Sequence, residues 1–440
     1  MSEARKILVL GASGLIGRFV TDDLRARGFP VVGIARRFAA SQKASKLDLE
    51  MPVMLMETDS LARLIGEHDI DVVVNCLGVL QDGPGSDVGA VHRDFVARLL
   101  QAIQASGRAI RLVQISIPGS SDEDRTAFST TKREAERLIA TSGVAYAILR
   151  PGFVIAPAAY GGSAMLRALA TLPVQLPAAE SATPFQPVDV EDIAATIAWL
   201  AGRDAGDKAT DAVVWDLMQS QPVTLGGVIE QFRSRFGTTD TARVTLSGFM
   251  LDLGAKLGDL ANRLGWMPPM RTTAIAELRR GVTGDPRAWM AVTGIAPKTL
   301  PQAVGARSAT IQDKWFARLF LMKALVIASL VVFWVASGFI ALVISYDAAA
   351  AILSLHGFPP ALVAPLTIGT SLMDMAIGAL IAFRRTCAAG LIAGIVVSLG
   401  YMVGAAILTP ELWIEPLGAL VKTGPAIVLM LAALLTLDNR

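Results

Sequence analysis

The hydrophobic positions of the chain follow two patterns, and the change between them comes near residue 313. After that point, four apolar stretches follow one another, over residues 319–345, 361–383, 387–408 and 417–437. Each has about the 20 residues that an α-helix needs to cross the hydrocarbon core of a bilayer. We therefore predict that residues 313–440 form a domain of four transmembrane helices.

The cations around these stretches predict their orientation. Most of them lie before or in the first stretch and between the second and third: Lys314, Arg318, Lys323, Arg384 and Arg385. The connections 346–360 and 409–416 contain no Lys or Arg. Because loops rich in Lys and Arg stay in the cytoplasm, we expect both termini and the Arg384–Arg385 turn to be cytoplasmic. Trp315 and Trp413 fall at the predicted membrane interfaces, where aromatic side chains are enriched.

Before residue 313, short apolar runs alternate with amphipathic segments. The runs "KILVL" and "FPVVGIA" come first; further strands are predicted at residues 53–56, 71–77, 111–115 and 145–149, and helices around residues 61–66, 86–106 and 124–142. This alternation predicts an α/β fold with a doubly wound parallel sheet. Ligands of such sheets bind beyond the carboxyl ends of the strands, so functional residues are expected there.

A glycine-rich turn follows the first strand. Gly11, Gly14 and Gly17 form the pattern G-x-x-G-x-x-G between a strand and a helix. The first glycine allows a tight turn, the second lets the backbone approach a pyrophosphate, and the third lets the helix pack closely on the strand. The amino terminus of the helix also favours phosphate charge. The turn therefore predicts a dinucleotide site.

The end of the second strand indicates which dinucleotide binds. An NAD site usually offers Asp or Glu there to the ribose hydroxyl, whereas this chain has Arg36 and Arg37. Two guanidinium groups suit a 2′-phosphate, so NADP(H) is favoured over NAD(H). The alternative is that both arginines are solvated surface residues.

Composition narrows the classes of function. Hydrophobic residues make up 53% of the chain and charged residues 18%, and a formal net charge of +2 gives no sign of nucleic-acid binding. Cys76 and Cys387 are too far apart to suggest a disulfide framework. The three histidines are scattered, so no metal site is predicted. The first apolar run is too short for an export signal.

Several motifs together resemble known families. They occur in this order: "GASGLIG", "NCLG", "VHRDF", "VQIS", "TKREAE", "ILRPG" and "FQPVDVEDIA". With them, residues 1 to about 310 resemble the atypical and extended branch of the short-chain dehydrogenase/reductase superfamily. The "VHRDF" stretch is similar to the NADPH-binding accessory subunit of respiratory complex I and its bacterial relatives. The end of the chain resembles the DoxX-like four-helix membrane family.

The resemblance implies a domain organisation and a location. It implies an NAD(P)-binding Rossmann domain over residues 1–217 and a variable lobe with a linker over residues 218–312. A DoxX-like domain would follow over residues 313–440. The implied location is a bacterial inner membrane.

The same resemblance implies roles for individual residues. Gly11, Gly14 and Gly17 would hold the pyrophosphate, with a hydrogen bond from Ser13. The remaining cofactor contacts would come from Arg36 and Arg37 at the 2′-phosphate, Asp59 near the adenine, Gly78 at the ribose and Lys132 at the nicotinamide ribose. Ser116 matches the serine or threonine that is catalytic or polarises the substrate.

One position departs from the family pattern. The family places a Tyr four residues before the Lys, and here that position is Phe128. A phenyl ring cannot exchange a proton, so the usual general acid of carbonyl reduction is missing. The neighbouring Ser and Thr hydroxyls are poor acids. Tyr160, in the loop after "ILRPG", is the candidate replacement.

Two functions remain open. The first is a membrane-anchored NADP(H)-dependent oxidoreductase that transfers hydride to a lipophilic or quinone-like acceptor, which needs less help from a protein acid. The second is a non-catalytic NADPH-binding protein, structural or redox-sensing, whose helical domain contacts a membrane partner. An epimerase or dehydratase acting on a sugar nucleotide would need the missing Tyr and is disfavoured.

Two further features have alternative interpretations. Apolar residues recur at helical spacing over residues 246–264, which suits either packing against the lobe or a helix lying on the bilayer surface. Asp374 lies within a predicted transmembrane stretch. It either handles protons or a quinone, or it holds helices together through a hydrogen bond. Elsewhere, Asp189 is expected to cap a helix, and His92 to lie on a helix and face the neighbouring loop.

Overall fold

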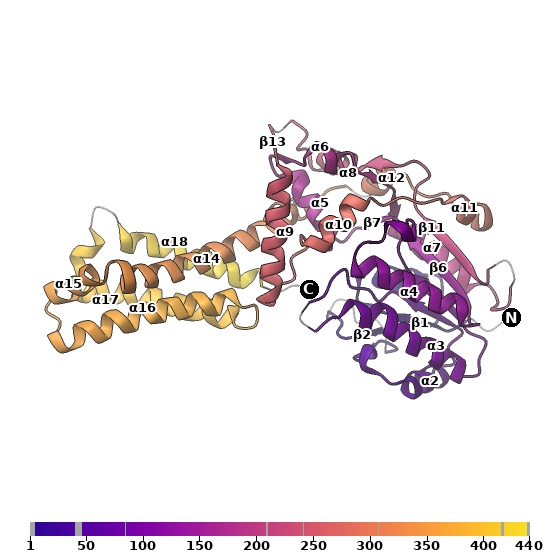
Figure 1. The fold of residues 1–440 in the computed structure, drawn as a ribbon, viewed down its shortest axis with the longest axis horizontal. Coiled ribbons are helices and arrows are strands. Elements are labelled where there is room, and N and C mark those ends of the chain that lie inside the picture. The colour runs from indigo at the N-terminus through magenta and orange to yellow at the C-terminus, as the bar shows by residue number, and fades with distance from the viewer. Residues whose placement is uncertain are drawn as a thin grey trace. The chain divides into compact units, whose positions relative to one another are not determined.

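The computed structural model describes residues 5–39, 46–83, 85–207, 210–240, 242–306, 308–414 and 418–437. The chain forms two compact units (Figure 1). The α/β unit comprises Met1–Asp259 and Pro268–Ala317, and the helical unit comprises Leu260–Met267 and Arg318–Arg440. The predicted cytoplasmic termini fall on residues 1–4 and 438–440, which lie outside the described residues.

A seven-stranded sheet organises the α/β unit. Its strands stand in the order β11-β6-β5-β4-β1-β2-β3, and every neighbouring pair is parallel. The strands are β1 (Ile7–Leu10), β2 (Val31–Ala35), β3 (Leu49–Glu50), β4 (Val72–Asn75), β5 (Arg111–Ile115), β6 (Ala145–Pro151) and β11 (Val213–Leu217). This confirms the predicted doubly wound parallel sheet. The strand order reverses between β1 and β4, and such a switch point is where these folds bind ligands.

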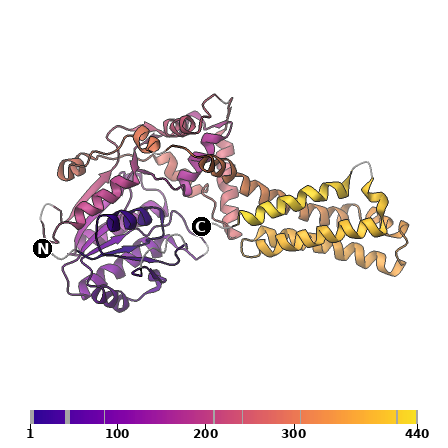
Figure 2. The ribbon, with the colours of Figure 1, turned by 180° about the vertical axis from the view of Figure 1, so that it is seen from behind.

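Both faces of the sheet are covered by helices, because successive strand residues point to opposite sides. Ile7 and Val9 join the core under α1 (Leu15–Ala26) and α7 (Val190–Ala201), the side seen in Figure 2. Leu8 and Leu10 join the core on the other side. That side is covered by α2 (Thr58–Glu67), α3 (Phe95–Ala105) and α4 (Ala127–Thr141). Asp189 caps α7 by accepting a hydrogen bond from the Glu191 amide, as predicted.

One predicted strand is wrong. Residues 53–56 do not form a strand: Val53–Leu55 is a short 3₁₀ helix, and the edge strand is Leu49–Glu50. Pro52 lacks the amide hydrogen that a strand ladder requires, so the edge strand ends before it. Val53 is still buried in the core. The apolar run that suggested a strand therefore reflects burial instead of strand pairing.

The lobe of the α/β unit is built from short strands and helices around a separate core. Its phenylalanines Phe185, Phe232 and Phe236 are buried there. The helices are α5 (Gly161–Thr171), α6 (Ala178–Ser181), α8 (Leu225–Phe236), α9 (Gly248–Arg263), α10 (Thr272–Arg280) and α12 (Leu300–Gly305). Helix α11 (Arg287–Thr293) instead packs on the core of the sheet through Trp289. The short strands are β7 (Phe153–Ile155), β8 (Val174–Gln175), β9 (Pro184–Phe185), β10 (Pro187–Asp189), β12 (Val223–Thr224) and β13 (Val244–Thr245).

Long apolar helices make up the helical unit. They are α14 (Met322–Phe339), α16 (Pro360–Ala382), α17 (Cys387–Leu408) and α18 (Ala419–Leu435), with α13 (Ile311–Phe320) leading into α14 and α15 (Tyr346–Leu355) following it. Among the described residues, three helical segments are long and apolar enough to cross a membrane: Ile311–Ile344, Pro360–Ala382 and Cys387–Leu408. The fourth predicted span corresponds to α18, which is 17 residues long, and its crossing of the bilayer stays a prediction.

Glycines bring these helices close together. A Cβ at Gly378 of α16 would lie 2.6 Å from Val335 of α14, and a Cβ at Gly394 of α17 would lie 2.7 Å from the sulfur of Met430. Small residues at such contacts are typical of transmembrane helix packing. The glycines of these helices therefore serve close packing.

Candidate cofactor and active site

The turn after β1 has the backbone geometry of a dinucleotide-binding loop. Gly11 has φ +81°, which favours glycine, and a Cβ there would lie 3.2 Å from Leu77 and 3.3 Å from the Cys76 carbonyl oxygen. Cys76 and Leu77 directly follow β4. The turn therefore lies at the switch point between β1 and β4.

The start of α1 is held close to this turn. A Cβ at Gly17 would lie 2.2 Å from the Gly11 carbonyl oxygen, so only glycine lets the helix begin there. Gly14 caps α1 without a side-chain hydrogen bond. The first amides of the helix thus have no capping side chain, and backbone amides at a helix start are suited to bind phosphate.

The other predicted nucleotide contacts lie around the same edge. Arg36 and Arg37 directly follow β2, the neighbour of β1, and both are exposed. Ser13 lies within the glycine turn. Asp59 is exposed in the first turn of α2 instead of directly following a strand. The roles of these four side chains stay predictions.

Lys132 is buried beside the end of β4. Its ammonium group donates hydrogen bonds to the carbonyl oxygens of Ile115, at 2.9 Å, and Leu77, at 3.5 Å. A Cβ at Gly78 would lie 3.5 Å from the Lys132 nitrogen, so the predicted residues Gly78 and Lys132 are brought together. Only 5% of Lys132 is exposed, and burial lowers its pKa to about 8.

His92 joins this cluster, a position that the sequence did not assign. As predicted, it faces the neighbouring loop, where its Nε2 accepts a hydrogen bond from the Val79 amide at 3.2 Å. Nδ1 therefore carries the proton of the neutral ring and donates to the Thr131 hydroxyl at 3.0 Å. Burial, reinforced by the charge of Lys132, lowers the pKa of His92 to about 2. The ring is thus neutral at physiological pH.

Phe128 packs against this histidine. The two ring centroids lie 5.6 Å apart in an edge-to-face arrangement. Phe128 and Lys132 are one helical turn apart on α4, so the phenyl ring occupies the helix position that the family gives to its proton donor. Its partner here is a neutral imidazole whose two nitrogens are already hydrogen-bonded.

Ser116 is engaged in a buried ionic network. Its hydroxyl donates to Glu136 at 2.5 Å, and Glu136 also accepts hydrogen bonds from Arg150, at 2.6 and 2.9 Å, and from Arg133. Burial alone raises the pKa of Glu136, but hydrogen bonds from Arg150 and Ser116 outweigh burial and lower it. In this arrangement Ser116 can accept a hydrogen bond from a substrate but cannot donate one.

This network was not predicted from the sequence, although a signal was present. Glu136 lies four residues after Lys132, on the same helix face, and Arg150 lies in the "ILRPG" motif at the end of β6. A charged pair at those two places predicts an ion pair between α4 and the sheet.

The lobe is tied to the beginning of α4. Arg280 of α10 bonds to the buried Asp124 at 2.7 Å, and Asp124 also bonds to Arg133 at 3.1 Å. Thr126, the cap of α4, bonds to Glu277 of α10. The helix that carries Phe128 and Lys132 is thus fixed by charges from the lobe.

Tyr160 precedes α5, and 52% of it is exposed. Its predicted role as the replacement proton donor stays a prediction.

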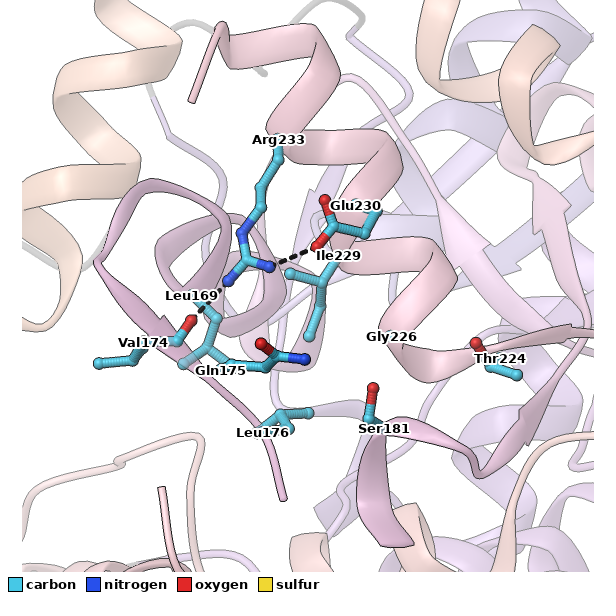
Figure 3. Close-up of a pocket in the computed structure, with 10 residues that line it drawn as sticks. All are labelled: Leu169, Val174, Gln175, Leu176, Ser181, Thr224, Gly226, Ile229, Glu230 and Arg233. Atoms are coloured by element: carbon cyan, nitrogen blue, oxygen red, sulfur yellow. Dashed lines mark hydrogen bonds and ion pairs between the residues drawn. The ribbon is translucent and has the colours of Figure 1, made fainter. Parts of the chain in front are cut away.

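A small cavity of about 130 Å³ lies within the lobe (Figure 3). Its lining comes from α5, α6, α8 and neighbouring strands, so it is separate from the turn after β1. Arg233 in its wall bonds to Glu230 at 2.6 Å and to the Val174 carbonyl oxygen. The charges of this cavity are therefore balanced within the lobe.

In the helical unit, a carboxyl group and a phenol are hydrogen-bonded to each other. Tyr401 of α17 donates to Asp374 of α16 at 2.9 Å. Asp374 therefore has the partner that a carboxyl group within a bilayer requires. This contact fits the interpretation in which Asp374 holds two helices together.

Two parts of the chain match known families. Residues 11–171 match a family described as NAD(P)H-binding, and residues 331–431 match the DoxX-like family. The chain carries an NAD(P)-binding Rossmann domain and a DoxX-like domain. The resemblance predicted from the motifs is confirmed for both domains. The DoxX-like match and the three long apolar helices indicate that the protein is membrane-associated.

Individual relatives cover the NAD(P)-binding part. A 3-diazoavenalumate denitrifying reductase from a Streptomyces species is 30% identical over 193 residues, which cover 38% of this chain and 62% of that protein. The match thus spans less than two thirds of that relative.

Solved structures show the same fold. MoeE5 in complex with UDP-glucose and NAD is 20% identical, with a TM-score of 0.51, over 72% of this chain and 99% of that one. A UDP-glucuronic acid 4-epimerase from Bacillus cereus, in complex with UDP-glucuronic acid and NAD, is 14% identical with a TM-score of 0.52. That alignment covers 72% of this chain and 99% of the epimerase. At these identities the likeness concerns the fold alone.

Proposed function

We propose that the Rossmann domain binds NADP(H) and serves as a membrane-anchored oxidoreductase for a lipophilic or quinone-like acceptor. The observation that supports this most is the pairing of a complete glycine turn with a buried Lys132 beside Gly78. Both belong to cofactor binding, and both are present although the family's Tyr is replaced. The bacterial inner membrane, with cytoplasmic termini, is the proposed location.

The residues of the site fit this cofactor. The amides of the α1 start and the glycine turn bind the pyrophosphate, and Arg36 and Arg37 supply the charge for a 2′-phosphate. The Lys132 ammonium has a third hydrogen for a ribose hydroxyl, because Ile115 and Leu77 take the other two. When bound, NADPH supplies a hydride.

A quinone-like acceptor is proposed because the site lacks a side chain that can donate a proton to the substrate. Phe128 has no proton to give, and Ser116 has its hydroxyl hydrogen on Glu136. A quinone-like acceptor can take its proton from water after accepting a hydride, so it needs no side-chain acid. A reductase name on a relative that is 30% identical supports reduction as the direction of the chemistry.

The alternative is a protein that binds NADPH without turnover, as a structural element or redox sensor that scaffolds a membrane partner. The specific observation in its favour is the Ser116–Glu136 bond together with Phe128. Both remove hydrogen-bond donors from the place where a substrate carbonyl would be polarised.

A turnover assay separates the two functions. The full chain is reconstituted in lipid nanodiscs, and NADPH and NADH binding are measured first. NADPH oxidation is then followed with panels of quinones and enones. We expect tighter binding of NADPH than of NADH, and oxidation with at least one quinone.

The variant Phe128→Tyr sharpens this assay. If the protein is an oxidoreductase, the wild type oxidises NADPH with quinones, and Phe128→Tyr gains activity on carbonyl acceptors. Binding without turnover in wild type, with activity appearing only in Phe128→Tyr, would establish the alternative. Tighter binding of NADH would contradict the role given to Arg36 and Arg37 while leaving the chemistry open.

A further inference from the structure

Helix α9 turns an apolar face away from the lobe. The exposed large side chains on this face are between 44% and 74% exposed: Phe249, Met250, Leu253, Leu257 and Leu260. Their spacing places them on one stripe of the helix. Packing against the lobe, one of the two interpretations of residues 246–264, is therefore confirmed for Leu246 and wrong for these five side chains.

The opposite face of α9 makes the contact with the lobe. Leu251, Ala255 and Gly258 are buried, and a Cβ at Gly258 would lie 1.9 Å from the Met270 carbonyl oxygen. The helix is thus packed through small residues on one side, which leaves the large apolar side chains on the other side without a protein core.

Of the charged residues beside the stripe, the acidic ones form ion pairs and, among the residues that the structure describes, the basic ones do not. Asp252 pairs with Arg279 at 3.0 Å, and Asp259 pairs with Arg271 at 2.9 Å. Lys256 and Arg263 are exposed, and neither forms an ion pair with a residue in the described part of the chain. The acidic residues are therefore neutralised, and the free charge along the stripe is positive.

The end of α9 belongs to the helical unit. Residues Leu260–Met267 are part of it: the Arg384 amide donates to the Leu264 carbonyl oxygen at 3.0 Å, and the Trp266 indole donates to the Ala382 carbonyl oxygen at 2.7 Å. Ala382 ends α16, and Arg384 lies in the turn before α17. The segment directly after α9, which ends at Arg263, is thus bonded to the end of a long apolar helix, at the Arg384–Arg385 turn that is predicted to be cytoplasmic.

A further crossing of the chain between the two units has a similar character. It lies within α13, where Ile311, Trp315 and Leu319 are exposed. Arg318 on the same helix is exposed as well. Tryptophan and arginine beside apolar side chains are typical of segments at a membrane interface. The crossing within α13 therefore has the composition of an interfacial segment, as the stripe of α9 does.

We propose that the apolar stripe of α9 lies in the headgroup region of the cytoplasmic leaflet, where Lys256 and Arg263 attract anionic lipid phosphates. An amphipathic helix with cations beside its apolar face binds such surfaces through burial and charge together. The bilayer is the occupant because Leu264 and Trp266, which follow α9, are bonded to the end of α16 and the turn after it, and α16 is one of the long apolar helices. The proposal does not depend on the chemistry proposed for the Rossmann domain.

Photo-crosslinking to lipid tests this placement. Benzoylphenylalanine is introduced at Leu253 or Leu257 of the full chain, in nanodiscs that contain phosphatidylglycerol, and adducts are identified by mass spectrometry. Val332, an exposed residue of α14, is the positive control. Thr130, an exposed residue of α4, is the negative control. We expect lipid adducts at Leu253, Leu257 and Val332 and none at Thr130.

Two outcomes would overturn the proposal. One is the absence of lipid adducts at Leu253 and Leu257 while Val332 is labelled. The other is crosslinking of these sites to a second copy of the chain, which would make the stripe a protein interface.

Charge reversal tests the role of the two cations. Each basic residue near an anionic membrane strengthens binding by about fivefold. Lys256→Glu with Arg263→Glu should therefore lower the lipid adducts at Leu253 strongly in phosphatidylglycerol nanodiscs and weakly in phosphatidylcholine nanodiscs. Arg137→Glu with Arg287→Glu, at exposed positions elsewhere, is the matched control and should leave them unchanged. Equal losses in both lipids would refute the part played by charge.

Discussion

Two neighbouring regions of the Rossmann domain differ in how they relate to their family. The turn after β1 keeps every backbone requirement of a dinucleotide loop, from the positive φ of Gly11 to the close approach at Gly17. The α4 region keeps Lys132 but replaces the phenol with Phe128 and binds Ser116 to Glu136. We expect cofactor binding and proton transfer to be separable, because α4 keeps Lys132 while it has no proton donor at position 128.

The strongest test of the turn is a side chain at Gly17. In Gly17→Val, the new Cβ would lie 2.2 Å from the Gly11 carbonyl oxygen, so the start of α1 must move. Loss of two charge-assisted hydrogen bonds of about 1.5 kcal/mol each weakens NADPH binding about 100-fold. Isothermal titration of the purified protein measures this loss.

Gly66→Ala is the matched control for this variant. A Cβ at Gly66 of α2 meets no atom within 4 Å, so NADPH binding should stay within twofold of wild type. Unchanged affinity in Gly17→Val would mean that the cofactor does not depend on this turn.

In the α4 region the largest expected effect is on stability. Glu136→Ala leaves the buried Arg133 and the partly buried Arg150 without their shared carboxylate. Loss of one partner of a buried ionic network costs about 3 kcal/mol, which denaturant unfolding of the α/β unit within the full chain would measure.

Glu136→Gln is the matched variant, since it keeps the shape and an acceptor for Ser116. Glu136→Gln is expected to lose less stability than Glu136→Ala. Equal stability of wild type and Glu136→Ala would show that the network does not hold α4 in place.

The turn after β1 could also be predicted from the sequence more completely than the α4 region. The glycine turn and the parallel sheet follow from spacing and from strand ends, because backbone geometry restricts the residue types that fit. The place of Lys132 was implied by the resemblance to the family. The network around Glu136 depends on side chains from α4, β6 and the loop after β5, and such contacts do not appear in a local pattern. His92 was correctly predicted to lie on a helix and face the neighbouring loop, but its contact with Phe128 could not be predicted from the sequence.

Residues 53–56 and helix α9 show two further limits of prediction from the sequence. The apolar run at residues 53–56 is buried without being a strand, because Pro52 interrupts the ladder. The stripe of α9 was recognised from its period, but a period alone does not tell whether an apolar face meets a core or a lipid.

The smallest expected effect concerns pH and links the two regions through Lys132. Burial lowers the pKa of its ammonium group to about 8, so the group is charged below that pH and neutral above it. A positive charge favours the anionic cofactor, and NADPH affinity should therefore be constant below pH 7 and fall as pH rises through about 8. The expected loss is about tenfold, and fluorescence titration between pH 6.5 and 9.5 would follow it.

The pH dependence of NADPH affinity is expected to come from Lys132, because the ionisable groups around it do not titrate in this pH range. The pKa of His92 is lowered to about 2 and that of Cys76 is raised to about 12. The pKa of Glu136 is lowered from an already acidic value. None of the three changes charge between pH 6.5 and 9.5. Lys132→Met should therefore bind NADPH more weakly than wild type and with no slope in this range. A slope that persists in Lys132→Met would assign the titration to another group and separate Lys132 from cofactor binding.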